Sequence, residues 1–426
     1  MTNKKYSEYY ADQSPIPFYV LLSLFILSNM LRVVNFTPEV KVIIDDVRVW
    51  INAAVILMGP MYFAFTLLLW KKSPWTFFIC AGLILTLFAL WNYIGQTKEY
   101  YTTTGAIFLA LLAYKKDYKV VLKIFLIAHL VTLLVGIIGL RIGFTTPRFK
   151  RETTDVGVSL GLIYPNHLGR MVYIVMTIAW YLWGQKKKVF ATISFWAMAV
   201  VMWFYVECKT IAIFMVVFPI CWWLCCVLEG RKILKPVKWL WNMILIIMPF
   251  LCFAFTYWAG KHRGWMMNNF EYGTGIYALM MRFISAGIFF DIYGFPLFGR
   301  NITDMIAPFE WREGHEYTAN VVDNAYIYYL IALGLIVLIA LMIWLCFATY
   351  RMIRNKDHAL VLMAVFFCGY GLIEVGYFQF EHNFLMFYPL TVAALMYKKK
   401  EEVNTSLEDN FEEKSEGPAL SITGES

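Results

Sequence analysis

Ionisable side chains gather in one long polar segment, residues 259–322, which separates two apolar runs and leads directly into Asp323 and Asn324. A connection of this length within a compact protein is usually functional or disordered. Its aromatic residues, among them Trp265 and Trp311, argue against disorder. We therefore expect the segment to contribute to a catalytic or binding site. Its charged and histidine side chains include Lys261, His262, Arg263, Arg282, Asp291, Arg300, Asp304, Glu310, Arg312, Glu313, His315 and Glu316.

Arg282 and Asp323 are the leading candidates for chemistry in this region. Arg282 interrupts the apolar stretch 276–290. A charged residue at membrane depth is costly, which favours a functional role. An arginine whose long side chain reaches the lipid headgroups is the alternative. Asp323 precedes the next apolar run, where a carboxylate can also serve simply as an acidic residue at a helix N-terminus.

A second group of cations lies between two earlier apolar runs. Arg148, Lys150 and Arg151 are followed by Pro165, which is suited to the first turn of a helix. Cations beside a helix N-terminus favour an anionic ligand such as a phosphate. Ordinary anchoring at the membrane interface explains the same residues equally well. Two further polar residues four positions apart, Asn166 and Arg170, would share one face of this helix.

The composition indicates an integral membrane protein. The chain has 426 residues, of which 60% are hydrophobic and only 15% charged. Soluble domains are about 45–50% apolar. The net charge of +8 does not indicate nucleic-acid binding, because the basic residues cluster in short connectors between apolar runs. We expect no nucleic-acid partner.

The apolar runs predict an all-α protein with about twelve transmembrane helices, each of about 20 residues. Alternate connectors are rich in lysine and arginine, which places those connectors and both termini in the cytoplasm. Residues 276–290 are too short to cross comfortably, so we expect a helix on or dipping into the outer leaflet. The expected spans are 17–33, 50–70, 75–94, 101–114, 118–140, 165–184, 189–206, 210–228, 238–258, 323–349, 358–379 and 383–397.

Two parts of the chain follow from this pattern. Residues 1–400 form a polytopic membrane domain, in which 259–322 is a large external loop between the ninth and tenth helices. Residues 401–426 are acidic and poor in large apolar side chains, which predicts a disordered cytoplasmic tail. No glycine-rich phosphate loop is present, so we expect no direct use of ATP and no cofactor.

Several short motifs resemble the O-antigen polymerase and ligase superfamily, which includes Wzy-type polymerases and WaaL-type ligases. The resemblance covers about residues 100–397. It rests on the run from Ser159 through Gly161 and Pro165 to Gly169, on the turn 295–299, and on Asp323 and Asn324 with Gly334 nine residues later.

The resemblance implies a GT-C-like membrane fold and a glycosyltransferase of the bacterial cytoplasmic membrane. Such an enzyme moves saccharides from undecaprenyl diphosphate to an acceptor, using neither a nucleotide sugar nor a metal ion. Membrane lipid, a flippase and chain-length regulators are the implied partners. Arginines would stabilise charge on the leaving diphosphate, and a base would accept the acceptor's proton. The expected catalytic residues are Asp323, His315 and Arg282; the expected substrate-binding residues are Arg148, Arg151, Lys150, Asn166, Arg170, Arg300 and Asn324.

The chain departs from the family motifs at its cations, and its departure at the ligase histidine position favours a polymerase. Polymerases often carry arginine, ten residues and then glycine; here Lys150 has this spacing to Gly161, whereas Arg282 is one residue too far from Gly294. Ligases carry a histidine where this chain has Asp323. The alternative enzyme is an O-antigen-ligase-like transferase that passes finished glycan to another acceptor.

A polysaccharide flippase or transporter is the alternative outside enzymes. Transporters typically bind substrate near the midplane between broken, repeated helices. This chain instead concentrates its ionisable groups in one external segment.

Overall fold

The computed structural model describes residues 16–71, 98–113, 116–146, 159–229, 235–269, 275–300, 307–312, 315–319 and 323–391. Within these ranges the chain is helical except for one β-hairpin and short connections. The helices are α2 (Ile16–Met30), α3 (Pro38–Lys71), α5 (Lys98–Leu112), α6 (Tyr118–Ile142), α7 (Pro165–Leu182), α8 (Lys188–Phe204), α9 (Lys209–Glu229), α10 (Lys235–Lys261), α11 (Arg263–Asn269), α12 (Gly275–Tyr293), α13 (Ala325–Leu333), α14 (Leu335–Arg354) and α15 (His358–Gly371), with 3₁₀ turns η1 (Leu31–Val33), η2 (Gly184–Lys186), η3 (Val375–Tyr377) and η4 (Phe384–Phe387).

The helices have the length and surface of a membrane-embedded protein. Of the described helices, five segments are long and apolar enough to cross a bilayer. Large apolar side chains on their outer faces are exposed, such as Ile213 and Leu224 on α9 and Trp239 on α10. A water-soluble protein rarely exposes so much contiguous apolar surface. The five segments are Ile16–Val33, Tyr118–Ile142, Lys209–Val227, Pro236–Lys261 and Leu335–Arg354.

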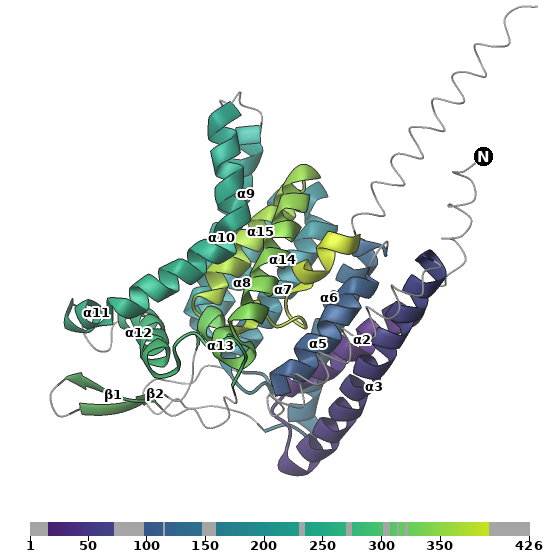
Figure 1. Ribbon diagram of the computed structural model, residues 1–426, viewed down its shortest axis with the longest axis horizontal. Coiled ribbons are helices and arrows are strands. Elements are labelled where there is room, and N and C mark those ends of the chain that lie inside the picture. The colour runs from purple at the N-terminus through teal and green to yellow at the C-terminus, as the bar shows by residue number, and fades with distance from the viewer. Residues whose placement is uncertain are drawn as a thin grey trace, which may run out of the picture.

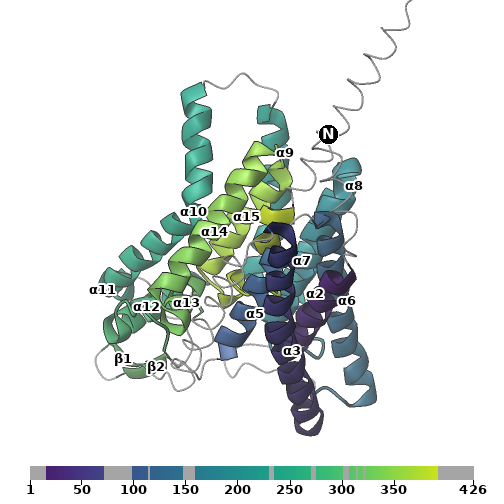
Figure 2. The ribbon, with the colours of Figure 1, turned by 45° about the vertical axis from the view of Figure 1, so that its right-hand side comes forward.

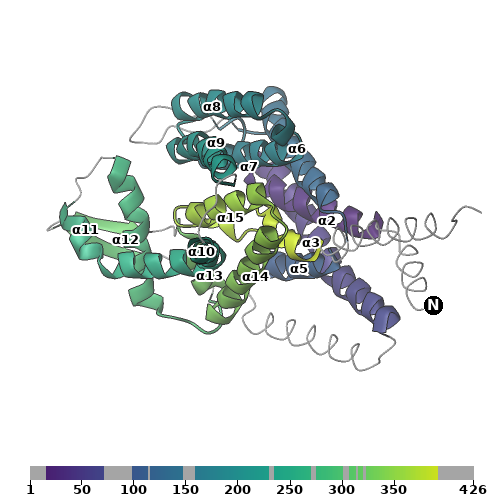
Figure 3. The ribbon, with the colours of Figure 1, turned by 90° about the horizontal axis from the view of Figure 1, so that it is seen from above.

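The helices surround a central helix, α15 (Figure 1). Seen from above, α15 lies between α7 and α9 on one side and α10 and α14 on the other (Figure 3). Helices α2, α3 and α5 pack together beside α6. Below its upper part, α10 turns toward α11 and α12 (Figure 2). Pro249 lies inside α10, and a proline removes one backbone hydrogen bond from a helix and favours such a bend.

Several predicted spans differ from the observed helices. The expected span 383–397 begins with the 3₁₀ turn η4, and its described residues are α-helical only from Tyr388 to Thr391. The expected span 323–349 is divided by Gly334 into α13 and α14. The expected span 358–379 ends at Gly371, and the following residues 372–387 form a buried connection with two 3₁₀ turns. The apolar composition continues through both sites, so hydropathy alone did not reveal them. The expected span 75–94 and the tail 401–426 lie outside the described residues.

The turn 295–299 packs directly against the break at Gly334. Gly334 has φ of +88°, and a Cβ there would overlap the backbone of Leu297 and Phe298. The Leu335 amide donates to the Pro296 carbonyl at 2.8 Å. Two motifs far apart in the sequence therefore form one unit that supports the buried helix α13.

An extended segment, residues 33–37, joins the N-terminal helices to the connection between α6 and α7. The Asn35 amide donates to the Gly161 carbonyl at 2.8 Å, and the Ile163 amide donates to the Val33 carbonyl at 2.9 Å. The Thr37 amide donates to the Phe144 carbonyl at 2.9 Å. These bonds fix the backbone immediately before α7. Helix α3 begins at Pro38, twelve residues before the expected span 50–70, so the charged residues between them are helical.

The polar segment 259–322 contains an unpredicted β-hairpin, so the chain is not entirely α-helical. Strands β1 (Ala307–Arg312) and β2 (His315–Ala319) pair in antiparallel register. Their sequences alternate apolar and polar residues, a pattern typical of short strands. The stretch 276–290 is helical as predicted, but residues 283–290 are buried. Helix α12 packs on α10, so it is part of the bundle and not a separate surface helix.

Candidate active site

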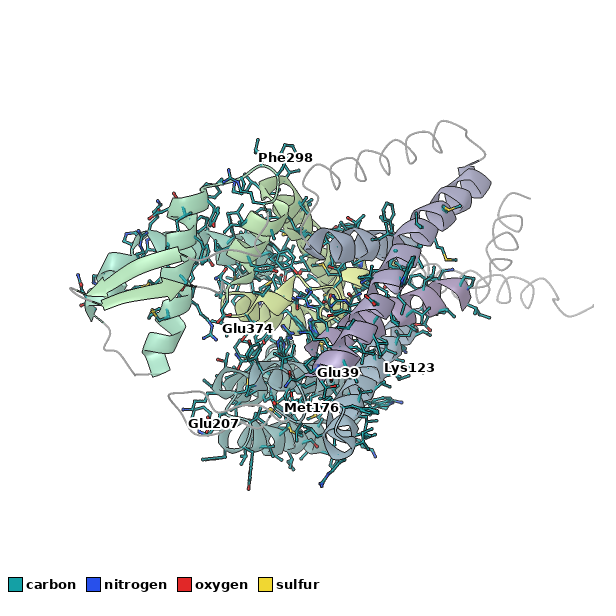
Figure 4. All side chains as sticks on the ribbon, turned by 90° about the horizontal axis from the view of Figure 1, so that it is seen from below. Glu39, Lys123, Met176, Glu207, Phe298 and Glu374 are labelled. Carbon is teal, nitrogen blue, oxygen red and sulfur yellow. The ribbon has the colours of Figure 1, made fainter. Side chains whose placement is uncertain are left out.

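Charged side chains from three separate parts of the chain converge at one end of α7. Arg282, on α12, lies with its Nε 3.9 Å from Asp323 Oδ2 and its Nη2 3.9 Å from Glu374 Oε1. Asp323 immediately precedes α13, and Glu374 lies beyond the end of α15. Seen from below, Glu374 lies between the α12–α13 region and helices α7–α9 (Figure 4). The structure thus brings together two of the predicted catalytic residues, Arg282 and Asp323.

Asn166 completes this group, which we call the polar cluster (Asn166, Arg282, Asp323 and Glu374). Its side-chain amide donates to Glu374 Oε1 at 2.8 Å. Pro165 begins α7, since its fixed φ suits the first helical position. The side chains of Arg282 and Glu374 are 18% and 17% exposed, whereas Asp323 is 44% exposed. The cluster is therefore recessed but accessible from the Asp323 side.

Glu374 is poised to exchange a proton near neutral pH. Burial raises the pKa of the Glu374 carboxyl to about 7, and the nearby Asp323 carboxylate contributes to the rise. The cations Arg170 and Arg282 and the hydrogen bond from Asn166 oppose it. A carboxyl with a pKa close to the ambient pH suits general acid–base catalysis.

Arg170 lies next to the polar cluster, one turn along α7 from Asn166. Its side chain is buried, and its Nη2 is 2.9 Å from His167 Nδ1. A Cβ at Gly376 would overlap the Arg170 guanidinium. Glycine at 376 thus allows the arginine to press against the backbone that follows Glu374.

Asn324 positions the cluster from within the protein. Its side-chain amide donates to the Leu372 carbonyl at 2.9 Å, and its Oδ1 accepts from the Ile327 amide at 3.2 Å as the N-cap of α13. The residue is completely buried. Asn324 therefore ties Asp323 to the connection that carries Glu374, instead of presenting its own side chain to a ligand.

The structure places two of the remaining predicted site residues on other elements. Arg300 is exposed, and its backbone amide donates to the Ile331 carbonyl at 2.7 Å. His315 lies on β2, where its backbone pairs with Arg312. Three predicted substrate-binding residues, Arg148, Lys150 and Arg151, lie outside the described residues.

Glu374 was not among the site residues predicted from the sequence. It lies among Gly369, Gly371 and Gly376 in an apolar run. The signal that could have found it is the cost of an ionisable group inside such a run. His382, which lies near Arg170 in the structure, stands in a connection that hydropathy assigned to the flank of a helix.

No protein-family model, curated protein or solved structure matches this chain. A functional interpretation therefore depends on the chemistry of the site and on the short motifs in the sequence.

Proposed function

We propose that this chain is a polysaccharide polymerase of the cytoplasmic membrane in bacteria. It transfers oligosaccharide repeat units from undecaprenyl diphosphate into a growing chain at the outer face. The proposal includes twelve spans, a GT-C-like arrangement and cytoplasmic termini. The supporting observation is the contact of Arg282 with two carboxylates, Asp323 and Glu374, at one end of an apolar helical bundle.

Arg282 has the charge that the leaving group requires. In the proposed reaction the bond between the anomeric carbon and the diphosphate oxygen breaks, and its electron pair stays on the diphosphate. A fixed guanidinium in a poorly solvated site stabilises that charge. The recessed position of Arg282 beside an apolar bundle suits a lipid-linked donor that enters sideways from the membrane.

The carboxylates supply the base. The acceptor hydroxyl oxygen bonds to the anomeric carbon, and its proton passes to a carboxylate. Glu374 suits this role best, because its pKa of about 7 lets it accept and then release a proton near neutral pH. Asp323, predicted from the sequence as the base, lies on the more exposed side of Arg282 and is proposed to orient the acceptor. His315 remains a candidate from the sequence alone.

Chain lengthening by purified protein tests the proposal. The full chain in lipid nanodiscs is supplied with lipid-linked repeat units, and products are resolved by length. We expect wild type to form a ladder, and Arg282→Ala to leave single repeats on the lipid while the protein remains folded. Arg354→Ala is the matched control, because Arg354 is exposed at the C-terminal end of α14.

Three outcomes would contradict the proposal. Wild-type product lengths in Arg282→Ala would remove this residue from the site. Transfer of finished chains to a different acceptor, with no lengthening, would indicate a ligase. Movement of lipid-linked repeats across sealed vesicles without any new glycosidic bond would indicate a flippase.

A further inference from the structure

A separate polar cavity lies next to Arg170, on the side of the N-terminal helices. Its volume is about 410 Å³, within the range of sites that bind small molecules. The ends of α2 and η1, the first turns of α3, the start of α7 and residues 379–382 form its walls. The charged and histidine side chains that matter most are Arg32, Arg48, His167, Arg170, Glu381 and His382.

Arg170 supplies a buried positive charge to this cavity. The residue is 5% exposed, and among the described residues its Nε has no hydrogen-bond partner. Its contact with His167 Nδ1 involves a neutral acceptor, and no described carboxylate lies within ion-pair distance of it. Arginine stays protonated in proteins, and a buried charge is costly unless an anion pairs with it. The environment of Arg170 is therefore suited to an anionic ligand.

His382 adds a second polar group without a partner. It is 1% exposed, and its Nδ1 has no hydrogen-bond partner among the described residues. Burial and the nearby Arg170 charge hold the pKa of His382 well below its usual value, so the ring is neutral. A neutral imidazole nitrogen can donate to or accept from a ligand hydroxyl.

The charge of the whole wall is positive. Four cationic side chains, Arg32, Lys41, Arg48 and Arg170, face two carboxylates. One of the carboxylates, Asp45, is 3.2 Å from Arg48. The cations of the lining outnumber its carboxylates by two, so its net charge is positive. The wall has both donors and acceptors, which suits a ligand that combines an anionic group with hydroxyls.

We propose that this cavity binds an acidic sugar residue through its carboxylate or phosphate substituent. Arg170 and Arg32 bind the anion, and His382 and Gln379 contact the hydroxyls. Arg170 lines the cavity and also influences Glu374 electrostatically, so a ligand in the cavity would lie beside the polar cluster. The saccharide identity of the ligand rests on the proposed function, whereas anion binding itself does not.

Direct binding to the purified full chain in zwitterionic nanodiscs tests this site. The probes are glucuronate, glucose and inorganic phosphate, measured by calorimetry without any turnover. We expect glucuronate to bind at least tenfold more tightly than glucose. We expect Arg32→Gln and Arg170→Gln each to weaken glucuronate binding at least tenfold, and Arg354→Gln, at a distant exposed position, to have no effect. A thermal melt of each variant establishes that it is folded.

The outcomes separate the sources of the anion. Binding of phosphate but not glucuronate supports the site with a phosphate substituent as its ligand. Loss of glucuronate binding in nanodiscs that contain anionic phospholipid overturns the sugar assignment in favour of a lipid headgroup. Equal binding of glucose and glucuronate, or unchanged binding in both folded arginine variants, overturns the anion site. An enzyme that lengthens chains yet binds no anion here would reject this site and leave the proposed function standing.

Discussion

The two ends of α7 carry polar side chains in contrasting arrangements. At its C-terminal end, the Tyr181 hydroxyl donates to Asp357 Oδ2 at 2.9 Å, and Tyr118 packs edge-on against Tyr388 with ring centroids 5.0 Å apart. We call these four residues the tyrosine cluster. At the N-terminal end, the contacts of Arg282 with its two carboxylates are 3.9 Å long.

The difference distinguishes a structural polar group from a functional one. In the tyrosine cluster, the hydrogen bond from Tyr181 to Asp357 satisfies two partly buried polar groups and stabilises the fold. In the polar cluster, the recessed Arg282 and Glu374 share a site with the more exposed Asp323 carboxylate, so two carboxylates and a guanidinium lie together beside an accessible surface. Functional sites often retain such costly arrangements of charge. Substitutions at the two ends are therefore expected to affect different properties of the protein.

The largest expected effect is on activity, and it comes from a substitution in the polar cluster at the N-terminal end of α7. Glu374→Gln retains an acceptor for the Asn166 amide but cannot take a proton. We expect the rate of chain lengthening to fall at least about 100-fold, the usual contribution of a general base. In wild type the rate should rise about tenfold per pH unit below the Glu374 pKa of about 7 and level off above it. Initial rates across this pH range measure both effects.

Protein stability should show the opposite pH trend at this residue. The folded state holds the Glu374 proton more tightly than the unfolded chain does, because the ordinary pKa of this carboxyl is 4.5. This contribution to stability is therefore complete below pH 4.5 and is lost as the pH rises through about 7. A Glu374→Gln variant with the wild-type pH–rate profile would exclude Glu374 as the base.

Substitution at the helix break should reduce activity and stability together. Gly334→Ala places a Cβ against the backbone of Leu297 and Phe298 at a φ of +88°. We expect a loss of about 2 kcal/mol or more in the free energy of unfolding, with a matching loss of folded, active protein. Thermal unfolding in nanodiscs measures it. Gly369→Ala is the control, because nothing lies within 4 Å of a Cβ there; equal stability of the two variants would contradict the prediction.

The smallest effect is expected in the tyrosine cluster. Tyr181→Phe removes the hydroxyl that donates to Asp357 and leaves that buried carboxyl with one partner fewer. We expect a loss of about 1 to 2 kcal/mol in stability. The rate of chain lengthening per folded molecule should stay within about twofold of wild type, since side chains at this end contact no substrate in the proposed reaction. A large loss of rate in folded protein would remove the distinction between the two ends.

The sequence predicted the ends of helices better than their interruptions. Asn166 and Asp323 were placed by the proline and polar residues that begin apolar runs, and the structure brings both to the polar cluster. The break at Gly334 and the end of α15 at Gly371 lie inside continuous apolar sequence. Their positions depend on backbone contacts with distant segments, which local hydropathy does not contain. The role of Glu374 also depends on distant segments, because Asn166 and Arg282 reach it from α7 and α12.

The N-terminal strand-like segment 33–37 also constrains how the protein assembles. Its hydrogen-bonding partners, residues 144–146 and 161–163, leave the ribosome more than a hundred residues later. Until α6 and the start of α7 have been synthesised and inserted, the backbone groups of residues 33–37, between α2 and α3, lack these hydrogen-bonding partners. The cavity beside Arg170 closes later still, when residues 379–382 are inserted. Nascent chains stalled before this point should lack the anion site even though most of their helices are already inserted.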